Sequence, residues 1–139
     1  MRAAMVSNQL RTNKVSDPRI VAAMKAVARE RFVPAERAAL AYIDVPIPLA
    51  NGRSLNSTLV TARLIVEAGI EPGEKVLLVG AATGYAAALL AELGAKVTAL
   101  EVDVSLTAIA KSAGISCVTG PLEAGWRKNA PYDVILIDG

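Results

Sequence analysis

The segment from Lys75 to Asp103 constrains the fold most, because it predicts a strand, a glycine-bearing turn, a helix and a second strand in succession. Glu101 follows the second strand and stands 21 positions after Gly80. In a parallel sheet the carboxyl ends of both strands meet at one edge. There, turn glycines let a ligand approach the backbone, and a carboxylate can accept hydrogen bonds from ribose hydroxyls. The unit therefore indicates a site for an adenosine-containing cofactor.

The spacing of the glycines distinguishes between cofactors. A dinucleotide-binding turn has the pattern G-x-G-x-x-G, whereas Gly80, Ala82 and Gly84 form the shorter pattern G-x-A-x-G. The shorter pattern is typical of S-adenosylmethionine (SAM) sites, in which no pyrophosphate has to lie on the helix N-terminus. It disfavours a nicotinamide-dependent oxidoreductase. An ordinary strand-to-helix turn is the remaining alternative, but the position of Glu101 favours cofactor binding over it.

Composition narrows the class of protein. The 139 residues, 53% of them hydrophobic, are enough for the core of one domain. The net charge of +2 is scattered along the chain, which argues against a nucleic-acid partner. Without histidine and with one cysteine, the common zinc-ligand sets are excluded and no metal is expected. Cys117 lies in an apolar run and is predicted to be a buried structural thiol. The absence of a signal peptide and of a membrane span predicts a cytoplasmic protein.

The chain is predicted to have two parts, an N-terminal helical segment with a loop over 1–72 and the N-terminal half of an α/β sheet over 73–139. Asp17 and Pro18 predict a helix start, and the apolar face of that helix leaves Arg19, Lys25 and Arg29 on its polar face. The other predicted elements are a short helix over 35–41, an extended segment over 45–49, helices over 57–68, 85–93 and 104–113, and strands over 75–79, 96–100, 115–118 and 133–137.

Short apolar strands that alternate with helices predict an α/β fold, a doubly wound parallel sheet with an N-terminal helical extension. The final strand is continuously apolar from Val134 to Ile137, and the sequence stops after Asp138 and Gly139. A strand of this kind is expected to be flanked on both sides, so a chain that stops here would have an exposed hydrophobic edge. We therefore expect the 139 residues to be a fragment of a longer domain.

Several segments along nearly the whole chain resemble the protein-L-isoaspartate O-methyltransferase family of SAM-dependent enzymes. The N-terminal segments carry much of this resemblance, because general methyltransferases share only the SAM turn. The matching segments are Asn8-Gln9-Leu10, Asp17-Pro18-Arg19, Arg29 to Pro34, Ala41 to Pro46, Gly80 to Tyr85, Ala87 to Leu93, Gly125-Trp126 and Ala130 to Asp133.

The resemblance implies methyl transfer from SAM to the carboxylate of isoaspartyl or D-aspartyl residues in damaged proteins and peptides, which would be the partners of this chain. The family has a Ser-Gln-Pro whose serine contacts the substrate carboxylate, and Asn56 stands at the serine position. Asn56 is therefore the predicted catalytic residue, with Ser54, Leu55 and Ser57 as substrate-binding neighbours. An amide can donate to a carboxylate. The alternative role for Asn56 or Ser57 is to cap the following helix.

The resemblance also assigns cofactor contacts and shows where this chain departs from the family. An apolar Leu78 replaces an acidic residue, Ala82 replaces a glycine, and Pro121 replaces an aspartate that meets the adenine amino group. These departures favour a second hypothesis, a catalytically degenerate protein that keeps the fold as a binding module. The predicted cofactor-binding residues are Gly80, Ala81, Ala82, Thr83, Gly84, Glu101, Val102 and Gly120.

Overall fold

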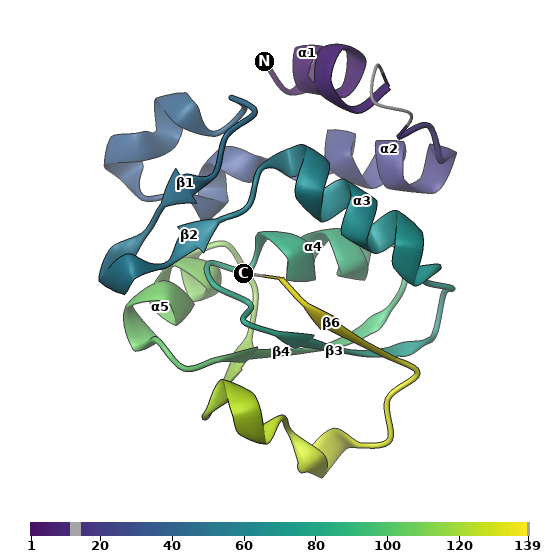
Figure 1. Ribbon diagram of the computed structural model, residues 1–139, viewed down its shortest axis with the longest axis vertical. Helices are drawn as coiled ribbons and strands as arrows, with labels where there is room; N and C mark the ends of the chain where they lie inside the picture. Colours follow the sequence, from purple (N-terminus) through teal and green to yellow (C-terminus); the bar gives the residue numbers. More distant parts are fainter. Residues whose placement is uncertain (12–14, 139) are drawn as a thin grey trace.

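The computed structural model describes residues 1–11 and 15–138 of the chain. Figure 1 shows a central sheet with the helix over 85–92 and the helices of the N-terminal part on one face, and an irregular crossover on the other. The sheet strands are β3 (Lys75–Val79), β4 (Lys96–Glu101), β5 (Cys117–Thr119) and β6 (Val134–Ile137). The α-helices are α1 (Arg2–Met5), α2 (Pro18–Ala26), α3 (Thr58–Ala68), α4 (Tyr85–Glu92) and α5 (Val104–Ser112).

The remaining elements are short. A two-residue hairpin pairs β1 (Ile47–Pro48) with β2 (Ser54–Leu55), antiparallel, around the 3₁₀ turn η5 (Ala50–Gly52). The other short helical segments are η1 (Val6–Leu10), η3 (Arg29–Phe32), η4 (Ala35–Leu40), η6 (Leu122–Ala124) and η7 (Arg127–Asn129).

The four strands are parallel and run in the order β5-β4-β3-β6, which confirms the predicted α/β fold with an N-terminal helical part. Leu78 pairs with Ala99 on one side and with Leu136 on the other. Leu78, Ala99 and Leu136 all belong to the main hydrophobic core. This register brings the carboxyl ends of β3, β4 and β6 to one edge of the sheet, so the residues that follow these strands become neighbours.

The local signals for helix ends are confirmed. The side chain of Asp17 caps α2 by accepting a hydrogen bond from the backbone N–H of Arg19 at 2.9 Å. Ser57 caps α3 by accepting from the N–H of Val60 at 3.4 Å, and Gly69 ends α3 in the left-handed conformation. Such caps depend on residues close together in sequence, which is why the sequence identifies them.

The prediction for Arg29 is wrong. Helix α2 ends at Ala26 and Val27 is extended, so the helical periodicity does not continue to residue 29. Arg29 is fully buried instead, and its guanidinium donates to the backbone oxygens of Ala41 at 2.6 Å and Asn56 at 2.8 Å. It also lies 4.6 Å from the ring centroid of Tyr85, in a cation–π contact. Arg29 therefore ties the N-terminal segment to the start of α4.

Three smaller predictions also need correction. The segment 35–41 forms the 3₁₀ helix η4 rather than an α-helix. Strand β5 begins at Cys117 instead of residue 115, because its pairing with β4 begins at Ala99. Ile115 packs near Gly84 outside the strand, where its Cβ is 3.2 Å from the position that a Cβ on Gly84 would take. Cys117 is half-buried rather than buried, and its pKa is raised by burial and by Glu101.

β6 lies at one edge of the sheet. Ile135 and Ile137 are 59% and 72% exposed, whereas Leu136 between them is 6% exposed. Two large apolar side chains of the edge strand thus face solvent, and Gly139 beyond them lies outside the described residues. Among the helices of residues 1–11 and 15–138, none is long and apolar enough to cross a membrane.

We expect Ile137→Thr to lower self-association of the 139-residue polypeptide, because it removes exposed apolar surface and keeps a β-branched residue suited to a strand. Size-exclusion chromatography with light scattering over a range of concentrations measures this. Val60→Thr is the control, since Val60 is 52% exposed and lies on α3 rather than on the edge strand. An equal decrease in both variants would show that β6 has no special part in association.

Candidate functional site at the carboxyl edge of the sheet

The loop from Gly80 to Gly84 joins β3 to α4 and lies against the end of β4. The backbone N–H groups of Gly80 and Ala81 both donate to the Leu100 oxygen at 3.0 Å. Gly84 has φ +95°, and a Cβ there would come within 3.1 Å of the Ala110 side chain. Only glycine combines this backbone conformation with this close packing. The structure thus places the predicted turn beside the strand that carries Glu101.

Glu101 is the centre of the site. Its side chain is fully buried, and its carboxylate accepts hydrogen bonds from the backbone N–H groups of Ala82 at 2.7 Å, Val102 at 2.7 Å and Asp103 at 2.8 Å. Burial alone would raise the pKa of Glu101. Hydrogen bonds from Arg53 and from these N–H groups outweigh burial and lower the pKa below its usual value. Glu101 is therefore held as a carboxylate.

Arg53 is the residue of this site that sequence reasoning missed. Its guanidinium donates to both oxygens of Glu101, at 2.8 and 2.7 Å, in a bidentate ion pair. Arg53 follows η5 on the β1–β2 hairpin. The same hairpin makes a second contact with the sheet edge, because the Asn51 amide donates to the Asp103 carboxylate at 2.8 Å. No local pattern indicated Arg53, since its partner is 48 positions away.

The other predicted cofactor residues lie around Glu101. The side chain of Thr83 is buried, and its hydroxyl has no hydrogen-bond partner among the described residues. The backbone N–H of Gly120 donates to the Glu101 carbonyl oxygen at 3.3 Å. A Cβ on Gly80 would lie 3.7 Å from the Arg53 guanidinium, so the guanidinium lies close over this glycine. The loop and the acid fit an adenosine cofactor, provided that Arg53 leaves the carboxylate.

Asn56 lies at the same edge and contacts an acid that sequence reasoning did not single out. Its amide nitrogen donates to the Asp138 carboxylate at 2.6 Å. Burial raises the pKa of Asp138, and the Asn56 hydrogen bond and the Arg29 charge only partly offset this. A Cβ on Gly80 would lie 3.4 Å from the Asp138 carbonyl oxygen, so this pair adjoins the loop.

The three predicted substrate-binding neighbours of Asn56 have structural roles in the fold. Leu55 is buried at 4% exposure in the main core, and Ser54 pairs with Pro48 in the hairpin. Ser57, not Asn56, caps α3. Of the four residues, Asn56 is therefore the one whose side chain bonds to the acid beside the glycine loop.

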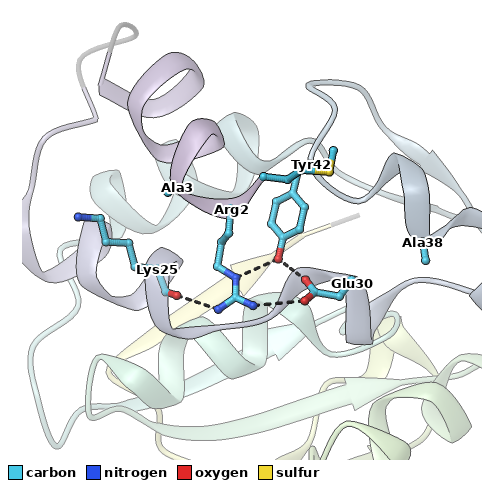
Figure 2. A pocket seen from close by; sticks show the side chains of 7 residues that line it. Arg2, Ala3, Lys25, Glu30, Ala38 and Tyr42 are labelled. Atoms are coloured by element: carbon cyan, nitrogen blue, oxygen red, sulfur yellow. Dashed lines mark hydrogen bonds and ion pairs between the residues drawn. The ribbon is translucent and has the colours of Figure 1, made fainter.

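A separate cavity of about 710 Å³ lies at the N-terminal part of the chain. Figure 2 shows Arg2 at its centre, donating to the Lys25 carbonyl oxygen and the Tyr42 hydroxyl, with the Glu30 carboxylate beside it. The Tyr42 hydroxyl in turn donates to Glu30. These contacts join α1 to the segments that follow α2. The cavity contains none of the residues predicted for cofactor or substrate, so it is not part of this site.

Comparisons with known proteins show which family the chain is similar to. The family model described as protein-L-isoaspartate(D-aspartate) O-methyltransferase matches residues 1–139. The chain is 40% identical to a protein-L-isoaspartate O-methyltransferase of Methylorubrum populi, covering 98% of this chain and 67% of that protein. It is 39% identical to one of Koribacter versatilis, covering 98% of this chain and 64% of that protein. The chain thus spans about two thirds of the length of these relatives.

Solved structures show the same fold. A protein-L-isoaspartate O-methyltransferase structure matches with a TM-score of 0.83 and 26% identity, covering 99% of this chain and 47% of that chain. A Plasmodium falciparum structure, in complex with S-adenosyl-L-homocysteine, matches with a TM-score of 0.83 and 16% identity, covering 98% of this chain and 72% of that chain. At that identity the second match supports the fold alone.

We expect Glu101→Gln to reduce the stability of the ligand-free protein at pH 7 by about 1.5–3 kcal/mol, because it removes the charge from this hydrogen-bond network. Folding lowers the pKa of Glu101. Its contribution to the free energy of unfolding is therefore fully present above the pKa of the unfolded state, and it is lost as pH falls through the pKa of the folded state. Urea unfolding from pH 7 to pH 3 should therefore show the two proteins converging at acid pH. The control Glu92→Gln changes an exposed position at the end of α4. Its free energy of unfolding should not differ from that of the wild type in a pH-dependent way.

Ala82 has φ +51°, which is unfavourable for a residue with a Cβ. Ala82→Gly should therefore raise the free energy of unfolding by up to about 1 kcal/mol, since glycine adopts this conformation without strain. Thermal unfolding measures the change. The matched substitution Ala86→Gly, inside α4, should instead destabilise the protein by about 1 kcal/mol. Loss of stability in both variants would show that Ala82 is not strained.

Proposed function

Because the chain belongs to the protein-L-isoaspartate(D-aspartate) O-methyltransferase family, we propose that it transfers a methyl group from SAM to the carboxylate of isoaspartyl residues in damaged proteins and peptides. The observation that carries this proposal is the position of Glu101 at the end of β4, within hydrogen-bond distance of the Ala82 N–H in the glycine loop. A carboxylate beside such a loop is suited to bind the two ribose hydroxyls of an adenosine cofactor.

The chain's own residues would have three tasks in this reaction. Glu101 would bind the ribose, the loop from Gly80 to Gly84 would leave room for the cofactor backbone to approach, and Asn56 would orient the substrate carboxylate. When bound, SAM supplies a methyl whose bond to sulfur breaks, with the electron pair going to sulfur, as a carboxylate oxygen forms the new bond to carbon. An ionised carboxylate needs no base, so alignment of the reactants can supply most of the rate enhancement, about 7–11 kcal/mol.

Two observations favour a second candidate function, a binding module that keeps the fold without the methyl-transfer activity. The oxygens of Glu101 already accept hydrogen bonds from Arg53, and the amide of Asn56 already donates to Asp138. Both predicted ligand contacts are thus engaged within the protein. A protein that binds S-adenosylhomocysteine but does not methylate an isoaspartyl peptide would support this alternative.

Calorimetric titration with S-adenosylhomocysteine and NAD in parallel, together with methyl transfer to an isoaspartyl peptide, tests the proposal. We expect binding of S-adenosylhomocysteine and not of NAD. Glu101→Ala should weaken that binding by about 1.5–3 kcal/mol, the value of hydrogen bonds to a charged group. Glu92→Ala, an exposed change on α4, is the control and should bind as the wild type does. Unchanged affinity in the Glu101 variant would remove this residue from the site.

A further inference from the structure

The Glu101 carboxylate has no room for a further hydrogen-bond donor. It accepts five hydrogen bonds, two from Arg53 and one each from the N–H groups of Ala82, Val102 and Asp103. A carboxylate offers about four lone-pair positions. Ribose hydroxyls can therefore bind to Glu101 only after one of these donors has left.

Arg53 is the donor that can leave. The three N–H groups belong to the glycine loop and to the residues directly after β4, so moving them would disrupt the backbone at the sheet edge. The Arg53 side chain is 23% exposed and reaches Glu101 from the separate β1–β2 hairpin. A long side chain can change rotamer while its backbone stays in place.

A displaced Arg53 would have few acceptors within the protein. The Asp103 carboxylate, whose charge also raises the pKa of Arg53, already accepts from Asn51 and from the Ser105 backbone and hydroxyl. The Asp138 carboxylate accepts from Asn56. A guanidinium released from Glu101 is suited to bind a new carboxylate in a bidentate manner.

We propose that Arg53 exchanges partners during the reaction: it pairs with Glu101 in the free protein, is displaced by the cofactor ribose, and then binds the substrate carboxylate. Arg53 is thus a specificity-determining residue that makes recognition of an anionic substrate depend on prior binding of the cofactor. This inference rests on the proposed function, because it takes Glu101 as the ribose-binding residue. It explains how a site whose Asn56 amide is already engaged can bind a carboxylate.

Arg53→Gln tests the exchange. Removing the competitor should tighten binding of S-adenosylhomocysteine by about tenfold, if the free site is open about one tenth of the time. In the wild type, S-adenosylhomocysteine should strengthen binding of an isoaspartyl peptide by a similar factor, because both ligands need the state in which Arg53 has left Glu101. By reciprocity, the peptide should strengthen binding of S-adenosylhomocysteine equally. In Arg53→Gln this coupling should disappear. Calorimetric titration of each ligand, alone and with the other saturating, gives all four affinities without any activity assay.

Three controls keep the result interpretable. The same peptide with its isoaspartyl carboxyl group amidated should show no coupling in either protein. Arg63→Gln, on the exposed surface of α3, should behave as the wild type. Arg53→Lys keeps the charge but not the bidentate geometry, so it should give intermediate values. If Arg53→Gln does not fold because buried Glu101 has lost its ion-pair partner, Arg53→Lys replaces it as the test variant. Thermal unfolding shows whether each variant is folded.

The outcomes separate this inference from the proposed function. If Arg53→Gln binds S-adenosylhomocysteine no more tightly than the wild type does, Arg53 does not compete for Glu101 and the exchange is overturned. If binding tightens but the peptide coupling persists, Arg53 does not bind the substrate carboxylate, and that half of the exchange is overturned. If no variant binds S-adenosylhomocysteine, the cofactor site itself is wrongly assigned, and the proposed function falls together with the inference.

Discussion

The hydrogen-bond network around the Glu101 carboxylate joins three segments that are far apart in sequence: the glycine loop after β3, the end of β4 and the β1–β2 hairpin. A fully buried carboxylate is costly unless it is paired and hydrogen-bonded. The loop and the hairpin meet these requirements, so their conformations are coupled to this one charge. The glycine loop at the sheet edge and the β1–β2 hairpin are therefore parts of one electrostatic unit.

Some parts of this unit could be predicted from the sequence and others could not. The loop and Glu101 follow from residue types in one strand–turn–helix–strand unit, and the parallel sheet then places the strand ends together. The sequence left the cap of α3 open between Asn56 and Ser57, and the structure identifies Ser57. The Arg53–Glu101 and Asn56–Asp138 contacts join residues 48 and 82 positions apart. Their pairing depends on where the hairpin lies over the sheet edge. That position results from tertiary packing, which no spacing within the chain encodes.

Asn56 illustrates why a position taken from a family pattern does not by itself define a role. The resemblance places it where the family has a serine, and the structure does bring it beside the glycine loop, through Asp138. Its amide, however, is already bonded to an acid. The site thus contains two internal pairs, Arg53 with Glu101 and Asn56 with Asp138. This arrangement neutralises the Glu101 charge with Arg53 and gives the Asp138 carboxyl group a hydrogen bond from Asn56 in the free protein. The response to a ligand then depends on which of these internal pairs breaks.

Buried Arg29 has a consequence for how the chain acquires its structure during synthesis. Its guanidinium bonds to Ala41 and Asn56 and stacks on Tyr85, which the ribosome adds long after Arg29 itself. Until Tyr85 emerges, the Arg29 guanidinium stays hydrated, and the core of the N-terminal third cannot pack around it. Contacts over such separations form late because the intervening chain must first be ordered. The nascent N-terminal third should thus stay open to proteases until the first turn of α4 has left the exit tunnel.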